Sequence, residues 1–80
     1  MVRHLTLSKD AKYVAIETAE RVIVGEVETG KEHLRFPFRD AAIVLFLNAD
    51  TLSVSDKNLK VVQDWSMKTK AQILPPRPRA

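Results

Sequence analysis

The stretch LSKDAKYVAI, residues 7–16, breaks an apolar run with the charged segment KDAK and then resumes it at once. Asp10 favours a turn, whereas the flanking segments are rich in the β-branched and aromatic residues that favour strands. A polar break this short between two such segments is typical of a tight turn. The stretch therefore predicts two strands joined by that turn.

The rest of the first half continues this alternation of short apolar segments and polar breaks. The break ETGK contains Gly30, which adopts positive φ without the steric penalty that other residues meet, so a hairpin connection is expected there. Pro37 has no N–H to donate to a strand ladder and is expected to end the fourth strand. The four predicted strands of this half are VRHLTLS, YVAIET, RVIVGEV and EHLRF.

The second half repeats the scheme, and the two halves align with a period of about 40 residues, which is associated with four-stranded propeller blades. We therefore expect one domain over residues 1–74, built from the repeats 2–36 and 41–74, with a Pro/Arg-rich tail over 75–80. The strands predicted in the second half are AAIVLFLN, TLSVS, LKVVQDW and KAQIL. The alignment places Leu7 with Phe46, Val14 with Leu52 and Thr29 with Thr69.

A helical interpretation of the first half is the alternative. Ser8 is a good helix N-cap, and apolar residues follow it at helical spacing. Two features oppose a helix: RVIVGEV is crowded with β-branched residues, which lose side-chain freedom in helices, and the second half has no helical counterpart. The residues at helical spacing are Ala11, Val14, Ala15, Thr18, Ala19 and Val22.

The repeats resemble the WD40 family, in which a turn of the type F-S-P-D-G-K follows the first strand and a Trp-Asp pair followed by T-G-K ends the third. LSKDAKYVAI is similar to that turn, and RVIVGEVETGK is similar to the third strand and its exit, with Gly25 and Glu26 in place of Trp and Asp. In the second repeat Trp65 falls at the tryptophan position and Ser66 replaces the aspartate. Neither repeat contains the family's Gly-His pair.

The resemblance implies an all-β fold of two four-stranded antiparallel propeller blades that serves as a protein docking platform or scaffold. Two blades alone leave apolar flanks in water, whereas propellers close with typically 4 to 8 blades. We therefore expect self-association into a ring of three or four chains, or completion of a larger propeller by another chain. The residues expected at contacts between blades or copies are Leu5, Leu7, Phe36, Phe38, Ile43, Leu45, Leu47 and Trp65.

The composition argues against an enzyme and against cofactors. The chain has no cysteine, and His4 and His33 lie far apart without metal-ligand spacing. With only two glycines, a glycine-rich phosphate loop is excluded. The carboxylate pairs Asp50/Asp56 and Glu26/Glu28 lie in turn-rich, solvated stretches, where the raised pKa that a general acid needs is not expected. Catalytic, cofactor and metal residues are therefore predicted to be absent.

Nucleic-acid binding is the main alternative function, because a small β-rich domain with a net charge of +3 is a candidate for a basic binding face. Lysines and arginines alternate with acids along the chain, however, so no stripe forms that would neutralise successive phosphates. The tail, as a polyproline II segment, is a second candidate for partner binding, with a disordered terminus as its alternative. Its residues are Pro75, Pro76, Arg77, Pro78 and Arg79.

The apolar runs are short. The longest, AAIVLFL, is far below the roughly 18 to 20 residues that cross a bilayer, and the amino-terminal segment contains Arg3 and Asp10, where a secretory signal would be apolar. An intracellular location, cytoplasmic or nuclear, without a membrane partner is therefore expected.

Overall fold

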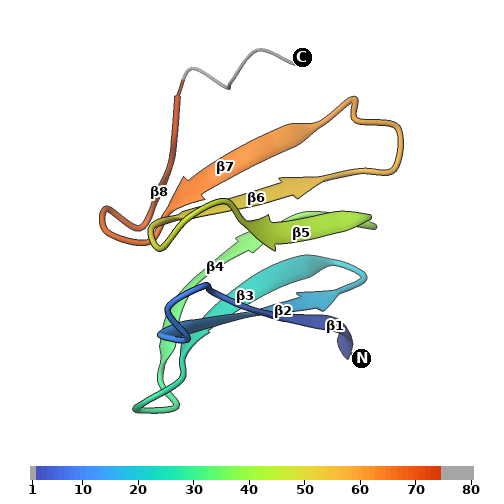
Figure 1. Cartoon of the computed structure of the whole chain (residues 1–80). Helices are drawn as coiled ribbons and strands as arrows, with labels where there is room; N and C mark the ends of the chain where they lie inside the picture. The colour runs from blue at the N-terminus through green and yellow to red at the C-terminus, as the bar shows by residue number, and fades with distance from the viewer. Residues whose placement is uncertain (1, 75–80) are drawn as a thin grey trace.

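The computed structural model describes residues 2–74, and in this range the chain forms two four-stranded antiparallel sheets and no helix (Figure 1). The strand orders are β1-β2-β3-β4 and β5-β6-β7-β8, so every strand pairs with its neighbour in sequence. The all-β prediction is confirmed, and the helical alternative is wrong. The strands are β1 (Val2–Leu7), β2 (Tyr13–Thr18), β3 (Arg21–Glu26), β4 (Glu32–Pro37), β5 (Ile43–Phe46), β6 (Thr51–Ser55), β7 (Val62–Ser66) and β8 (Ala71–Gln72).

The turn between β1 and β2 is held by side chains that bond to the backbone. The Ser8 hydroxyl donates to Asp10 Oδ1 at 2.7 Å and accepts from the backbone N–H of Tyr13 at 3.0 Å. Asp10 Oδ1 also accepts from the N–H of Lys12 at 3.1 Å, and Ala11 adopts a φ of 60°. The hydrogen bond from Ser8, followed by that from Lys12, lowers the pKa of Asp10. The charged break in the sequence is therefore the tight turn that was predicted.

Three strands of the second sheet are shorter than the sequence predicted. β5 covers only Ile43–Phe46 of the predicted strand AAIVLFLN. β7 begins at Val62 instead of Leu59, because Asp56 Oδ1 accepts from the N–H groups of Lys60 at 2.8 Å and Val61 at 3.2 Å and so draws these residues into a turn. β8 contains only two residues, Ala71–Gln72, of the predicted strand KAQIL.

The two sheets have the same register of strand pairing. Leu7 lies opposite Val14 across β1 and β2, and Phe46 lies opposite Leu52 across β5 and β6. The next ladder agrees as well, since Val14 lies opposite Gly25 and Leu52 opposite Trp65. Residues paired in the first three strands thus have equivalents about 40 residues later in β5, β6 and β7.

Equivalent turns follow the third strand of each sheet. The N–H of Gly30 donates to the carbonyl of Glu26, and the N–H of Lys70 donates to the carbonyl of Ser66, at 2.8 and 2.9 Å. The φ angles are 74° at Gly30 and 59° at Lys70, so the positive φ predicted for Gly30 is confirmed. In the second turn a lysine adopts the conformation that glycine adopts more easily.

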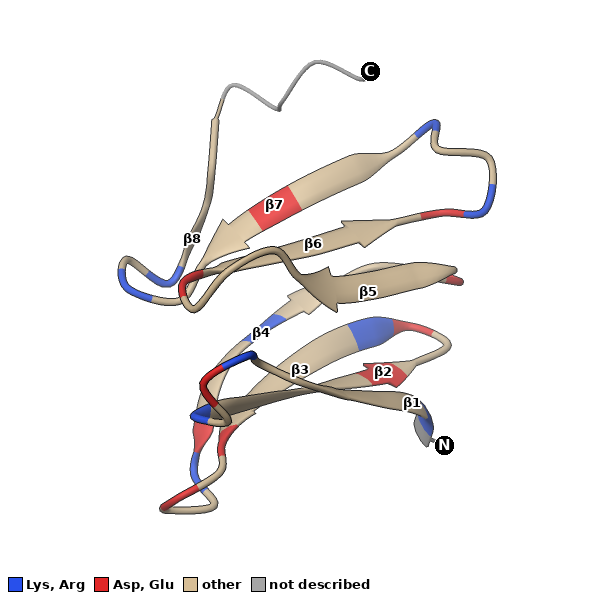
Figure 2. Ribbon diagram, in the orientation of Figure 1, with Lys and Arg blue, Asp and Glu red and all other residues tan. Residues whose placement is uncertain are grey.

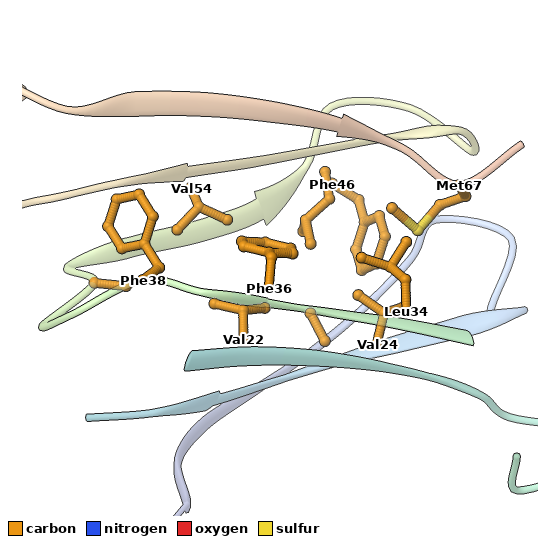
Figure 3. Close-up of a cluster of buried hydrophobic side chains, with 11 residues drawn as sticks. Val22, Val24, Leu34, Phe36, Phe38, Phe46, Val54 and Met67 are labelled. Carbon is orange, nitrogen blue, oxygen red and sulfur yellow. The ribbon is translucent and has the colours of Figure 1, made fainter. Parts of the chain in front are cut away.

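The core lies between the two sheets, which stack face to face with β1 and β2 against β5 (Figure 1). We call the faces that meet the inner faces and the opposite faces the outer faces. Figure 3 shows the core side chains of the two sheets pointing toward one another. The core consists of Ala15, Val22, Val24, Leu34, Phe36, Phe38, Ala41, Phe46, Leu52, Val54 and Met67.

Within residues 2–74 the structure contains no helix with the length and apolar character needed to cross a membrane.

Candidate functional site

The outer face of the first sheet is apolar and uncovered. Leu5, Ile16 and Ile23 form a direct cross-strand row on β1, β2 and β3, and Leu7 lies opposite Val14 beside it. Leu5 and Leu7 are 65% and 61% exposed. These five residues are called the first outer face below. A contiguous apolar sheet face that water reaches is typical of an association surface.

The outer face of the second sheet has a different character. Its exposed apolar residues lie along two margins, with Ile43 and Leu45 on β5 and Ile73 and Leu74 after β8. Its middle carries buried polar residues of β6 and β7, which lie on this side because Ser53 is the direct partner of both Leu45 and Asp64. The second outer face is defined by Ile43, Leu45, Ser53, Ser55, Asp64, Ile73 and Leu74.

The exposed apolar residues are concentrated on these two faces. Among the described residues, nine large apolar side chains are exposed. Six of them belong to the two faces already defined. A seventh, Val27, follows β3 at the position equivalent to the buried Met67. The remaining two, Leu59 and Val61, lie between β6 and β7. Exposed apolar surface is therefore not scattered over the molecule.

The residues that the sequence suggested for contacts divide into two groups. Phe36, Phe38 and Trp65 lie between the two sheets of one chain, and the rings of Phe36 and Trp65 stack with centroids 4.2 Å apart. Leu47 is half-buried in the turn between β5 and β6, where its N–H donates to the carbonyl of Thr51. The members that lie on the outer faces are Leu5, Leu7, Ile43 and Leu45.

Sequence reasoning missed part of the outer faces. Ile73 and Leu74 of the second outer face were not selected, and neither was Val27, which lies outside both faces. The repeat makes Val27 equivalent to Met67 and Leu74 equivalent to Leu34, and both of these equivalents are buried core residues. That equivalence was the signal that would have found Val27 and Leu74. The proline and arginine residues of the tail, 75–79, lie outside the described residues.

An open groove of about 570 Å³ lies at one end of β3 and β4. Arg21 Nη2 lies 3.7 Å from Glu20 Oε2, and Arg35 forms an ion pair with Glu32 that lowers the pKa of that carboxyl. Within residues 2–74, Arg39 has no ion pair. Most of the positive charge of the groove is therefore neutralised internally. The lining residues are Glu20, Arg21, Arg35, Phe36, Pro37 and Arg39.

Glu17 is the most deeply buried acidic side chain described, with 2% exposure. Its Oε1 lies 3.3 Å from Nδ1 of His4, and its Oε2 lies 3.8 Å from Nε of Arg3. Oε2 accepts no hydrogen bond from a described residue. Glu17 thus pairs with one arginine and one histidine. Residues 2–74 contain no group of three acidic, histidine or cysteine side chains arranged to hold a metal.

His33 links the two sheets. Its Nε2 donates to the backbone carbonyl of Met67 at 2.7 Å, and its Nδ1 lies 3.4 Å from Glu26 Oε2. Hydrogen bonds first from Thr29 and then from His33 lower the pKa of Glu26. The ring of His33 also packs against Tyr13, with centroids 4.7 Å apart. The hydrogen bond to Met67 therefore joins the two sheets at the margin of their inner faces.

The chain was compared with protein-family models, with curated proteins and with solved structures. No significant match is found in any of the three comparisons.

Proposed function

We propose that this chain is a non-catalytic protein-interaction module of the WD40-like propeller type, in which each four-stranded sheet is one blade. Copies associate head to tail and close into a ring, with six blades from three chains or eight from four. The observation that carries the proposal is the apolar surface on the outer sides of both sheets, where Leu5 and Leu74 are 65% and 68% exposed.

The size of the chain supports association. A globular chain of 80 residues buries only about 60% of the surface that its unfolded form exposes, so its stability is marginal when it stands alone. Each apolar side chain that moves from water into a contact contributes about 25 cal/mol per Å² of buried area. A neighbouring copy that covers the outer faces therefore adds stability that the single chain lacks.

The path of the chain also supports blades. After β4, at one edge of the first sheet, the chain passes to β5, which lies against β1 and β2 at the other side of that sheet (Figure 1). Each sheet thus begins near the same side of the molecule and ends away from it. A propeller needs this path, because its blades are arranged around one central channel.

The mass of the native assembly tests the proposal. Sedimentation equilibrium and native mass spectrometry over a range of concentrations are expected to give one species with three or four chains. Leu5→Lys is expected to shift that species toward monomer, because it places a charge on the first outer face. Leu59→Lys is the matched control, since Leu59 is an exposed leucine outside both faces.

A folded monomer at all concentrations would refute self-assembly. An isolated chain that precipitates, and that becomes soluble only with a second protein, would instead favour completion of a propeller by another chain.

The arginine-lined groove favours a second candidate function, the binding of nucleic acid or another polyanion. Three arginines around an open concavity can contact phosphate groups. Figure 2 shows, however, that basic and acidic segments follow one another along the first sheet, and two of these arginines already face glutamates. Association through the apolar faces is therefore the better supported function.

A further inference from the structure

We infer that the contact between copies pairs Leu5 of one copy with Leu45 of the next, and Val27 with Ile73. The inference rests on the proposed function and specifies its partner, a second copy of this chain, residue by residue. All four side chains are exposed in the single chain, by 65%, 40%, 47% and 36% respectively.

Each outer face is equivalent, by the repeat, to the inner face of the other sheet. The strand registers place Leu5 at the position of Val44 and Leu7 at the position of Phe46. The first outer face is thus the counterpart of the inner face of the second sheet, which is covered by the first sheet. By the same equivalence, the second outer face is the counterpart of the inner face of the first sheet. The second outer face of one copy can therefore pack on the first outer face of another copy in the way that the two inner faces pack within one chain.

A hydrogen bond joins the two inner faces at the margin formed by β1 and β5. The Thr6 hydroxyl donates to the carbonyl of Val44 at 3.3 Å, which fixes how β1 lies against β5. The position equivalent to Thr6 is Leu45, and the position equivalent to Val44 is Leu5. If one copy follows the next as the second sheet follows the first, Leu45 meets Leu5.

A second hydrogen bond joins the inner faces at their opposite margin. His33 Nε2 donates to the carbonyl of Met67 at 2.7 Å. The equivalent positions are Ile73 and Val27, because the N–H of Val27 donates to the carbonyl of Lys12 as the N–H of Met67 donates to that of Asp50. Ile73 thus stands where the single chain has the His33 side chain, and the backbone of Val27 stands where the backbone of Met67 accepts the hydrogen bond. Ile73 and the Val27 side chain are both apolar. Their mutual burial removes both from water.

Side-chain sizes at the centre of the outer faces match those at the equivalent positions of the inner faces. In the single chain the inner face of the first sheet carries the small residue Ala15 and that of the second sheet the large residue Leu52, and both belong to the buried core. The equivalent positions on the outer faces are Ser53 and Val14, again a small residue and a large one. Large side chains that face small ones allow two sheets to approach closely.

One contact of the inner faces has no counterpart between copies. Trp65 stacks on Phe36 within the chain, whereas its equivalent on the first outer face is Gly25, which has no side chain. The contact between copies is therefore weaker than that between the two sheets of one chain. Leu5 and Leu45 also lie on opposite sides of one chain, so the contact is heterologous and continues from copy to copy.

Disulfide cross-linking tests the pairing, since the chain has no cysteine of its own. Leu5→Cys and Leu45→Cys are mixed, assembled and oxidised; a disulfide between one chain of each kind is expected, and neither variant alone is expected to cross-link. The same is expected for Val27→Cys mixed with Ile73→Cys. A bond requires Cα atoms within about 7 Å, so the test is specific for this register.

The double variant Thr6→Cys/Val44→Cys is the positive control, because it should form a disulfide within one chain under the same conditions. Assembly by mass without either mixed cross-link overturns the pairing and leaves the proposed function standing. A monomer by mass overturns both. Far-ultraviolet circular dichroism of each variant checks the fold, which should persist because all four substituted side chains are exposed.

Discussion

Phe36 of the first sheet and Trp65 of the second stack with ring centroids 4.2 Å apart and planes only 9° from parallel. Phe36 belongs to the buried core and Trp65 packs against that core, so this pair joins the two sheets. Figure 3 shows Phe36 pointing from the first sheet into the core. Trp65 is held in place by its Nε1–H, which donates to Gln63 Oε1 at 3.1 Å. The pair is therefore a fixed contact between the two halves of the chain.

Replacement of Phe36 by leucine keeps an apolar side chain but removes the ring stack. We expect the free energy of unfolding to fall by about 0.5 to 1.5 kcal/mol beyond the loss due to buried area. Phe38→Leu is the matched control, because Phe38 is also buried but stacks on no other ring within the described residues. Urea unfolding followed by circular dichroism at one protein concentration measures both. Equal losses in the two variants would show that the stack contributes nothing specific.

Gly30 and Gly25 are predicted to respond to alanine in opposite directions. Gly30 has a φ of 74°, and alanine there costs about 1 to 2 kcal/mol from backbone strain alone, since nothing lies within 4 Å of the added Cβ. In Gly25→Ala the added Cβ meets Val14 Cγ1 at an ordinary 3.6 Å. This variant is expected to stabilise by about 0.5 to 1 kcal/mol, because glycine loses more entropy in a strand. Thermal unfolding compares them, and destabilisation by Gly25→Ala would contradict the prediction.

Asp10 is predicted to make part of the stability dependent on pH. The pKa of Asp10 is lowered below its ordinary value of 3.8 by the Ser8 hydroxyl and the Lys12 N–H, so its ionised form stabilises the fold. This contribution is complete above 3.8 and is lost as the pH falls through the lower pKa of the folded state. Asp10→Asn should therefore be less stable than the natural chain at pH 7, and the difference should shrink under acidic conditions.

The control for this prediction is Glu28→Gln. Glu28 is an exposed carboxylate with no hydrogen bond or ion pair to a described residue, so the variant should match the natural chain at every pH. Urea unfolding at several pH values at fixed salt provides the comparison. A stability difference between Asp10→Asn and the natural chain that stays constant with pH would rule out titration of Asp10 as its cause.

The arginine-lined groove is predicted to bind nucleic acid only weakly. Because Arg21 and Arg35 face glutamates, few phosphates are neutralised, and binding of a mixed-sequence oligonucleotide should vanish at about 150 mM salt. Fluorescence anisotropy with the natural chain and with Arg39→Ala measures this. Tight binding that falls steeply with salt and weakens in Arg39→Ala would instead support the nucleic-acid function.

Much of the fold was predictable because its signals are local. The turn at Ser8 and Asp10 depends on hydrogen bonds within five residues, and the hairpin at Gly30 depends on one backbone angle. The late start of β7 was not predicted, because it depends on Asp56 bonding to backbone groups four and five residues away. The apolar residues of LKVVQDW predict a strand whether or not Asp56 draws the first of them into a turn.

The candidate site was predictable only in part. Leu5, Leu7, Ile43 and Leu45 were selected from apolar runs, but the same reasoning also selected Phe36 and Trp65, which the two sheets bury against each other. Residues of both kinds look alike in a sequence. What separates them is which face of each strand meets the other sheet.

The sequence alone determined the number and order of the strands and the positions of most turns, because β-branched residues, turn formers and glycine act over a few neighbouring residues. It also determined that both sides of the first sheet are apolar. Only the tertiary structure decided that Ala15, Val22 and Val24 are covered while Leu5 and Leu7 remain in water. The hydrophobic effect has no direction, so two apolar sides are equivalent until another sheet packs against one of them.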